Sequence, residues 1–279
     1  MNKLLLAIDK IDKMSDNAWM NTLSDRKKKE LEFHDRDRDT NIINETKASD
    51  TYEKFYGNKK YYTATKRSVD YVQKWISKEA KNKIFLDYAC GNGSNAISAA
   101  KAGALLSLGF DISSVSVNNA KNIATDKKIA NIRFFQADAE NTKLPNNSID
   151  TIICSGMLHH LDLSYALPEL RRILKPGGKL LAVEALDYNP AIKIYRKFTP
   201  SMRTDWEKAH ILSLKDLKFS KRFFDIGNVK YWHVCGYIGG KFPFLLQPLD
   251  LIDRFIEKIP FIQYMSWMFT FELVKREEK

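Results

Sequence analysis

The stretch from Lys83 to Ala96 constrains the fold more than any other part of the chain. It begins with the short apolar run K-I-F-L-D-Y, which is typical of a buried strand. A turn of small residues follows over Ala89–Gly93, and a helix is predicted from Ala96, with Ser94 or Asn95 as its N-cap. A strand, a glycine turn and a helix N-terminus in this order predict a site for a nucleotide-like ligand.

The glycine spacing alone does not say which nucleotide is bound. Gly91-x-Gly93-x-x-Ala96 fits the dinucleotide fingerprint, and both glycines let a ligand approach the backbone closely. However, Asp87 precedes Gly91 by four residues, where a dinucleotide-binding strand is usually apolar. A carboxylate aimed at the pocket would repel a pyrophosphate and attract a cationic aminoacyl group. The pattern therefore favours a cationic nucleoside cofactor over NAD.

Further acids follow at the ends of the next predicted strands. Asp111 ends a strand over Leu105–Phe110 and lies 20 residues after Gly91, where a carboxylate can accept hydrogen bonds from both ribose hydroxyls. A third strand over Asn131–Phe135 is followed by Asp138. Asp111 therefore supports a nucleoside ligand without identifying it.

These features resemble the class I S-adenosylmethionine-dependent methyltransferases, in the small-molecule branch that includes methyltransferase type 11 and the enzymes of ubiquinone and menaquinone biosynthesis. Asp87–Gly93 resembles motif I of that family, D-x-G/A-C-G-x-G, and the run I-I-C-S-G-M-L-H-H-L resembles its motif IV region. The turn L-K-P-G-G is a strong family mark. The matching elements occur in the family's order: Asp87–Gly93, Asp111, Asp138, Cys154–Leu161 and Pro176–Gly178. The resemblance covers roughly Lys81 to Leu186.

The resemblance implies S-adenosylmethionine as cofactor, and no metal is expected because the sequence shows no metal-ligand spacing. It implies that the cofactor is bound by Asp87, Ala89, Cys90, Gly91, Gly93, Asp111, Ile112, Asp138, Ala139, Cys154 and Ser155. His159 or His160, at the mouth of the site, is the candidate general base, because an imidazole titrates in the useful range. The candidate acceptor contacts are His34, Tyr56, Tyr62, Glu184, Arg203 and His210.

The expected fold is α/β: a Rossmann-like, doubly wound sheet of seven strands, mostly parallel, with the last strand antiparallel. Residues 1–80 are expected to form a helical extension or lid, 81–188 the cofactor-binding core, and 189–279 the rest of the sheet with substrate-cap helices. Within the extension, the mixed-charge stretch Asp25–Asp39 is predicted to be mostly a solvated helix or loop, in which F-H-D either lines an active-site lid or lies on the surface. Trp206–Leu217 is predicted to be one helix.

Composition limits the possible location and partners of the protein. Three cysteines, without metal or disulfide spacing, predict a reducing, cytoplasmic location. No run reaches the roughly 18 apolar residues of a spanning helix, and Leu4–Ile8 lacks the flanks of a signal peptide. The net charge of +11 permits nucleic acid, anionic lipid or an acidic substrate as partner, although lysines interleaved with acids also describe an ordinary solvated surface. The apolar and aromatic segment 245–271 predicts either burial or peripheral membrane contact.

The sequence does not identify the methyl acceptor. The position where methyltransferases of adenine or glutamine carry N/D-P-P-Y/F holds Cys154-Ser155-Gly156-Met157, which disfavours base methylation of that type. O-methylation of a small or lipid-linked acceptor is the first hypothesis, and C-methylation of a quinone-like ring is the second. An RNA-binding or RNA-methylating protein and a non-catalytic scaffold are alternatives from other classes. No separate RNA-binding module is visible in the sequence.

Overall fold

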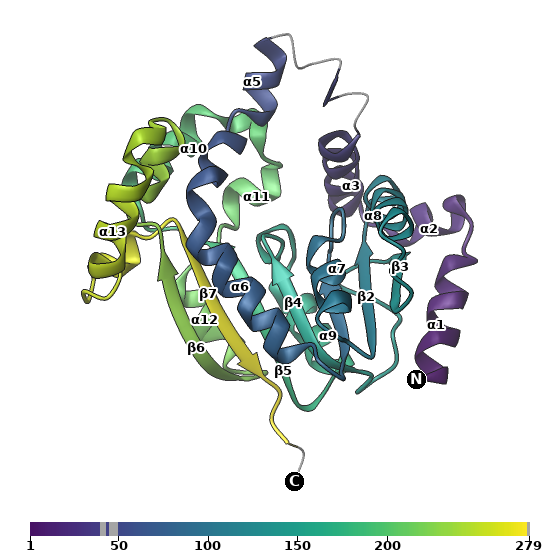
Figure 1. Ribbon diagram of the computed structural model, residues 1–279. Coiled ribbons are helices and arrows are strands. Elements are labelled where there is room, and N and C mark those ends of the chain that lie inside the picture. The colour runs from purple at the N-terminus through teal and green to yellow at the C-terminus, as the bar shows by residue number, and fades with distance from the viewer. Residues whose placement is uncertain (40–42, 45–49, 278–279) are drawn as a thin grey trace.

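Seven strands form one sheet in the order β3-β2-β1-β4-β5-β7-β6, in a computed structural model that describes residues 1–39, 43–44 and 50–277 (Figure 1). All neighbours are parallel except those of β7, which runs antiparallel to both β5 and β6. The strands are β1 Ile84–Tyr88, β2 Leu106–Asp111, β3 Ile132–Gln136, β4 Ile149–Ser155, β5 Leu174–Ala185, β6 Asp225–Trp232 and β7 Met268–Val274. This confirms the predicted α/β fold and its antiparallel last strand.

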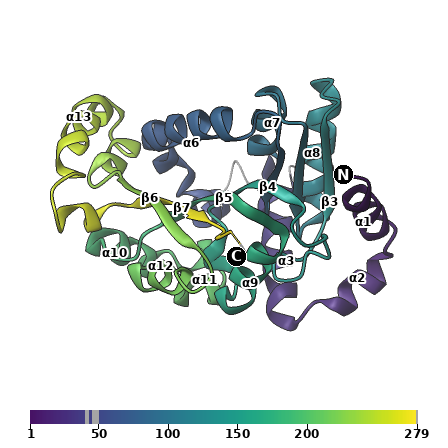
Figure 2. The same cartoon turned by 90° about the horizontal axis from the view of Figure 1, so that it is seen from below.

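Helices cover both faces of the sheet, with α6, α7 and α8 on one face and α9 and α12 on the other (Figures 1 and 2). The α-helices are α1 Asn2–Asp12, α2 Asp16–Thr22, α3 Asp25–Arg38, α5 Asp50–Tyr56, α6 Lys66–Glu79, α7 Ser94–Lys101, α8 Ser114–Asp126, α9 Leu163–Ile173, α10 Pro190–Phe198, α11 Asp205–Ala209, α12 Leu214–Ser220 and α13 Leu246–Ile256. The short 3-10 helices are η1 Lys59–Thr65, η2 Leu158–His160, η3 Pro200–Met202, η4 Gly236–Gly240, η5 Pro243–Leu245 and η6 Ile262–Met265.

The central strands are apolar on both faces because each face meets a helix layer. Phe85 and Ile153 pack with Trp75 and Ile76 of α6, whereas the neighbouring residue Leu86 belongs to the core on the opposite side. Successive side chains of a strand point to opposite faces, so one continuous apolar run supplies both cores. The two helix layers hold the sheet in place, and the loops that follow its parallel strands lie at the carboxyl edge.

Three local predictions need correction. The N-cap of α7 is Gly93, in the left-handed conformation at φ 78°, and Ser94 is already helical. The predicted helix over Trp206–Leu217 is two helices, because Ser213 and Asp216 form a capping box that starts α12 anew. The sequence also predicts a turn over Lys175–Gly178 before a fifth strand over Lys179–Glu184, whereas the observed strand already begins at Leu174 and shifts register where it pairs with β4.

The mixed-charge stretch is a helix, α3, which lies over the carboxyl edge of the parallel strands (Figure 1). Its alternating charges do not face only water, as a purely solvated helix would require. Glu30 and Leu31 are buried, and several basic residues of the helix line the pocket described below. Among the described residues, no helix is long and apolar enough to cross a membrane.

Candidate active site

A pocket opens where β1, β2 and β4 end, under α3. Seven of the predicted cofactor-binding residues line it, namely Ala89, Gly91, Asp111, Ile112, Asp138, Ala139 and Ser155. The carboxyl ends of adjacent parallel strands share one edge of the sheet, which is why residues far apart in the sequence meet there.

Asp111 is held at the tip of β2 by its own backbone neighbours. One carboxylate oxygen accepts from Gly91 N at 2.8 Å and the other from Ser113 N at 3.0 Å. The side chain is therefore fixed in the pocket before any ligand arrives, and each oxygen has a second lone pair for a hydroxyl donor. This geometry suits the two hydroxyls of a ribose.

Asp138 lies on the other side of the pocket, paired with α3. Lys27 Nζ lies 2.6 Å from Asp138 Oδ2 and 3.0 Å from Glu140 Oε2. Burial acts to lower the pKa of Lys27, but its bonds to the two carboxylates outweigh burial and the pKa is raised. Arg26 pairs with Glu140 as well. Two cations of the helix therefore lie against Asp138 and its neighbour Glu140.

The remaining predicted cofactor residues lie behind the pocket wall. Asp87 is buried and accepts from Ala96 N at 3.1 Å, at the start of α7. Burial raises its pKa to about 7, against the opposing effect of hydrogen bonds from Ala96 and Asn95. Cys90, Gly93 and Cys154 likewise do not line the pocket, and a Cβ on Gly93 would lie 2.5 Å from the ring of Phe134. Direct contact of these four with a cofactor remains a prediction.

His159 is paired with Glu184, which is fully buried at the end of β5. Glu184 Oε1 accepts from Met157 N at 3.0 Å and Leu158 N at 2.8 Å, and Oε2 lies 2.6 Å from His159 Nδ1. Burial acts to lower the pKa of His159, but the Glu184 carboxylate outweighs it and raises the pKa. The carboxylate therefore holds the proton on Nδ1 and leaves Nε2 as the free basic nitrogen.

His160 faces the first pocket and belongs to a different pair. Its Nδ1 lies 2.9 Å from Glu30 Oε2 of α3, and Thr204 donates to the other oxygen of Glu30 at 2.6 Å. Burial lowers the pKa of His160, and the neighbouring His159 adds to the effect. His34 of the F-H-D element stands beside the His160 ring, at a centroid distance of 4.8 Å, and burial lowers its pKa to about 4. The F-H-D histidine therefore lies in the pocket, as the lid interpretation expected.

A second pocket adjoins the first through the two histidines, whose ring centroids are 4.3 Å apart. His159 lines this pocket, with Nε2 3.9 Å from Glu207 Oε1. Arg203 lies 3.4 Å from the same carboxylate. The rest of the wall is largely aromatic and includes Tyr61, Tyr62, Tyr195, Tyr237 and Trp267. The pocket thus combines apolar area with a few convergent polar groups, as small-molecule sites do.

The candidate acceptor contacts divide accordingly. Tyr62 and Arg203 line the second pocket, His34 lines the first, and Glu184 acts on His159 from behind. Tyr56 and His210 line neither of these two pockets. Tyr56 donates from its hydroxyl to the Arg36 carbonyl at 3.2 Å, and His210 stacks on Trp206 at 3.7 Å between ring centroids.

The sequence analysis missed several residues that line the two pockets, chiefly Arg26, Lys27, Glu30, Arg38, Arg196 and Glu207. These side chains sit on helices whose charge patterns resemble those of a solvated surface, so no local signal marked them. Only the F-H-D element hinted that α3 approaches the site.

Two groups of side chains in the site could also hold a metal ion. The ligand atoms of Glu30, His34 and His160 lie within 4.8 Å of one another, as do those of His159, His160 and Glu207. The hydrogen bonds described above already engage Glu30, His159 and His160, and the prediction of no metal remains untested.

The fold and the site together define a class. A sheet of order 3-2-1-4-5-7-6 with an antiparallel seventh strand carries a glycine turn and a ribose-type carboxylate at its carboxyl edge. This is the Rossmann-like architecture of the S-adenosylmethionine-dependent methyltransferases. Asp111 and Asp138, the small residues Gly91 and Ala139, and the apolar Ile112 fit the ribose, the adenine and the close backbone approach of that cofactor.

The comparisons with known proteins agree. Residues 86–182 match the family model described as a methyltransferase domain. An uncharacterized methyltransferase, YcgJ, of Bacillus subtilis is 28% identical over 46% of this chain and 51% of its own length. The ubiquinone/menaquinone biosynthesis C-methyltransferase UbiE of Rickettsia prowazekii is 37% identical over 37% of this chain and 44% of its own length.

A third relative, the 27-O-demethylrifamycin SV methyltransferase of Amycolatopsis mediterranei, is 32% identical over 42% of this chain and 43% of its own length. The chain thus spans about half the length of the curated relatives it matches. Among solved structures, phosphoethanolamine N-methyltransferase 2 of Haemonchus contortus superposes with a TM-score of 0.59 at 18% identity, covering 89% of this chain and 60% of that one. The [4+2]-cyclase SpnF superposes with a TM-score of 0.55 at 19% identity, covering 76% and 83%. These similarities show the fold.

Proposed function

We propose that the protein transfers a methyl group from S-adenosylmethionine to the oxygen of a small-molecule or lipid-linked acceptor bound in the second pocket. The observation that carries the proposal is the Glu184–His159 pair. His159 lines the second pocket with a basic nitrogen. Its ring packs against that of His160, which lines the first pocket together with Asp111 and Asp138.

When bound, the cofactor supplies an activated methyl group on a sulfonium leaving group. The chain's own task is to position the acceptor, exclude water and take up the acceptor's proton. Glu184 holds Nδ1–H of His159, so that Nε2 can accept a proton from a hydroxyl in the second pocket. Glu207, 3.9 Å from Nε2, would then stabilise the imidazolium that forms.

Methylation of a ring carbon is the second candidate. It is favoured by the aromatic wall of the second pocket and by the relative named as a C-methyltransferase of ubiquinone and menaquinone biosynthesis. A carbon acceptor also loses a proton, so the same histidine would serve.

Cofactor binding is tested first, by calorimetric titration of the protein with S-adenosylmethionine, S-adenosylhomocysteine and NAD. We expect binding of the first two and its loss in Asp111→Ala, because that variant lacks both ribose-facing oxygens. Binding of NAD alone would overturn the proposal, and binding of no ligand would favour a scaffold.

Acceptor chemistry is tested next with a panel of phenols, catechols and quinols, incubated with cofactor labelled in the methyl group. Mass spectrometry detects transfer, and NMR of the product assigns the label to oxygen or carbon. A structural neighbour bears the name of a cyclase, so transfer has to be measured rather than assumed from the fold.

A further inference from the structure

The segment from η4 to η6 exposes an unusual number of large apolar side chains. We call this set the outer apolar surface, and it consists of Ile238, Phe242, Phe244, Leu251, Ile252, Phe255, Ile259, Phe261 and Ile262. Phe244 and Phe261 are 77% and 80% exposed. Contiguous apolar patches on a soluble protein usually mark an interaction site. This segment overlaps the stretch whose sequence predicted either burial or membrane contact.

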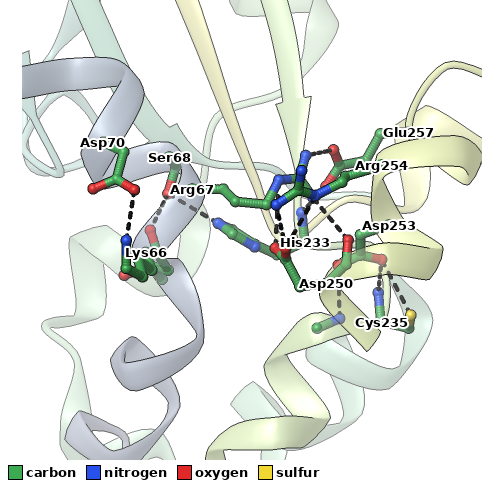
Figure 3. A network of polar contacts seen from close by, with 12 residues as sticks. Lys66, Arg67, Ser68, Asp70, His233, Cys235, Asp250, Asp253, Arg254 and Glu257 are labelled. Atoms are coloured by element: carbon green, nitrogen blue, oxygen red, sulfur yellow. Dashed lines mark hydrogen bonds and ion pairs between the residues drawn. The ribbon is translucent and has the colours of Figure 1, made fainter. Parts of the chain in front are cut away.

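Helix α13 is inverted relative to an ordinary surface helix, because its acids face the protein interior (Figure 3). Asp253 is fully buried and accepts from Cys235 N and Gly236 N, both at 2.9 Å. Glu257, also buried, pairs with Arg67 and accepts from His233 N at 2.5 Å. An amphipathic helix normally buries its apolar face.

The polar network therefore fixes the orientation of α13. Four partners on the inner side hold Asp253 and Glu257, so the opposite side, with Leu251, Ile252 and Phe255, has to face outward. The exposure of these three side chains follows from specific hydrogen bonds and ion pairs, not from loose packing.

The charges that accompany the outer apolar surface are cationic. Between Ile238 and Ile262 the exposed charged residues are Lys241, Arg254 and Lys258. Asp250 is only partly exposed and is paired with Arg254 at 3.0 Å. Exposed aromatic and aliphatic side chains with lysines at their rim complement an anionic lipid surface, where phosphate groups meet the cations and the acyl boundary meets the rings.

The backbone at Phe261 supports a functional cause. Its φ is 70°, in the left-handed region that a bulky residue rarely adopts, and among the large apolar residues whose burial is described Phe261 is the most exposed. A strained conformation that places a phenylalanine in water gains little within the protein, and such outliers cluster at binding sites.

We propose that the outer apolar surface docks on an anionic lipid bilayer as a peripheral contact, with Phe244, Phe255 and Phe261 entering the interface. Docking stands on this geometry alone and does not depend on methyl transfer. Tyr237 of η4 and Trp267, two residues after η6, line the second pocket. Docking would therefore bring that pocket close to lipid, a consequence that rests on the proposed function.

The test is co-sedimentation of the purified full chain with vesicles of phosphatidylcholine, alone or mixed with phosphatidylglycerol, at low and high salt. We expect binding to the anionic vesicles that weakens with salt. The double variant Phe244→Ser/Phe261→Ser should bind at least roughly tenfold more weakly, because two ring insertions are lost. The control, Leu6→Ser/Leu105→Ser, changes two apolar side chains that are 60% and 59% exposed and lie outside this surface, and it should bind like the parent.

Charge is tested separately with Lys241→Glu/Lys258→Glu, which should lose binding to the anionic vesicles. Thermal melting of every variant checks that the fold is intact, and none is expected to change it because all these side chains face solvent. The proposal is wrong if the parent chain ignores anionic vesicles at low salt, or if the control pair loses binding equally. It is also wrong if sedimentation shows a dimer that Phe244→Ser/Phe261→Ser dissociates, since the surface would then bind a second copy. None of these readouts requires turnover, so they are independent of the proposed reaction.

Discussion

Replacing Glu184 by Gln separates the chemical role of this residue from its structural role. Both backbone donors, Met157 N and Leu158 N, bond to the same oxygen, Oε1, while Oε2 alone meets His159. Glutamine can keep an oxygen at the first position and place its NH2 group at the second. His159 Nδ1 must then accept rather than donate, which moves the ring proton to Nε2. The nitrogen that faces the second pocket is then no longer basic.

The cost in stability should be small and the cost in activity large. A charge-assisted hydrogen bond to the imidazole, worth about 1.5–3 kcal/mol, becomes a neutral one worth about 0.5–1.5, so we expect a loss of roughly 1 kcal/mol. Glu184→Ala is the contrast, because it leaves two buried N–H groups unpaired at roughly 1–3 kcal/mol each. Loss of a positioned base lowers turnover by about 10² to 10⁴.

The measurements are an NMR titration of His159, chemical denaturation at several pH values, and turnover with an acceptor identified from the phenol panel. In the parent, the pKa of His159 is raised above the unfolded value. Its stabilising contribution is therefore fully present below pH 6.5 or so and is lost as the pH rises through the folded pKa. In Glu184→Gln the pKa should fall and this contribution should vanish, so that parent and variant converge in stability at alkaline pH.

The reasoning is refuted if Glu184→Gln keeps the parent's turnover and an unchanged His159 titration. Unchanged turnover with a shifted titration would keep the pairing but remove the base, leaving positioning of the acceptor as the main contribution of the site.

Three further predictions follow from other parts of the structure. Gly93→Ala should lower the free energy of unfolding by about 2–5 kcal/mol, because it adds left-handed backbone strain and places a Cβ 2.5 Å from the Phe134 ring. Gly156 also has a positive φ, but a Cβ there would meet no atom within 4 Å. Gly156→Ala should therefore cost only about 1–2 kcal/mol when both variants are measured by urea titration. His34 and His233 both have a pKa lowered to about 4, chiefly by burial, so stability should fall as the pH drops from about 6.5 towards 4, and Gln at either position should flatten that slope in acid denaturation. Treatment with EDTA should leave turnover and melting temperature unchanged, and restoration of lost activity by added zinc or manganese would show that the histidine–carboxylate groups hold a metal.

Much of the core and of the cofactor site followed from local sequence. Apolar runs of strand length, a glycine turn and cap residues depend on a few neighbouring side chains, so the strands and most of the helices could be located before the structure was known. The position of Asp111 also followed, because a strand's carboxyl end is set by the strand itself. The limits of this reasoning appear at Trp206–Leu217, where a capping box at Ser213 divided the predicted helix.

The pairing of side chains was decided only by the tertiary structure. Glu184 and His159 are 25 residues apart, and Glu30 and His160 are 130 apart, so no periodicity could join them. The mixed charges of α3 describe a solvated helix equally well until the helix is placed over the site.

The same limit applies to α13. Its sequence shows that the helix has an apolar side and an acidic side, but not which side is buried. The acidic side is buried because Arg67 and the backbone N–H groups of residues 233, 235 and 236, all outside the helix, bind its carboxylates. A local pattern records the two faces of an element, and long-range contacts determine which of them meets water.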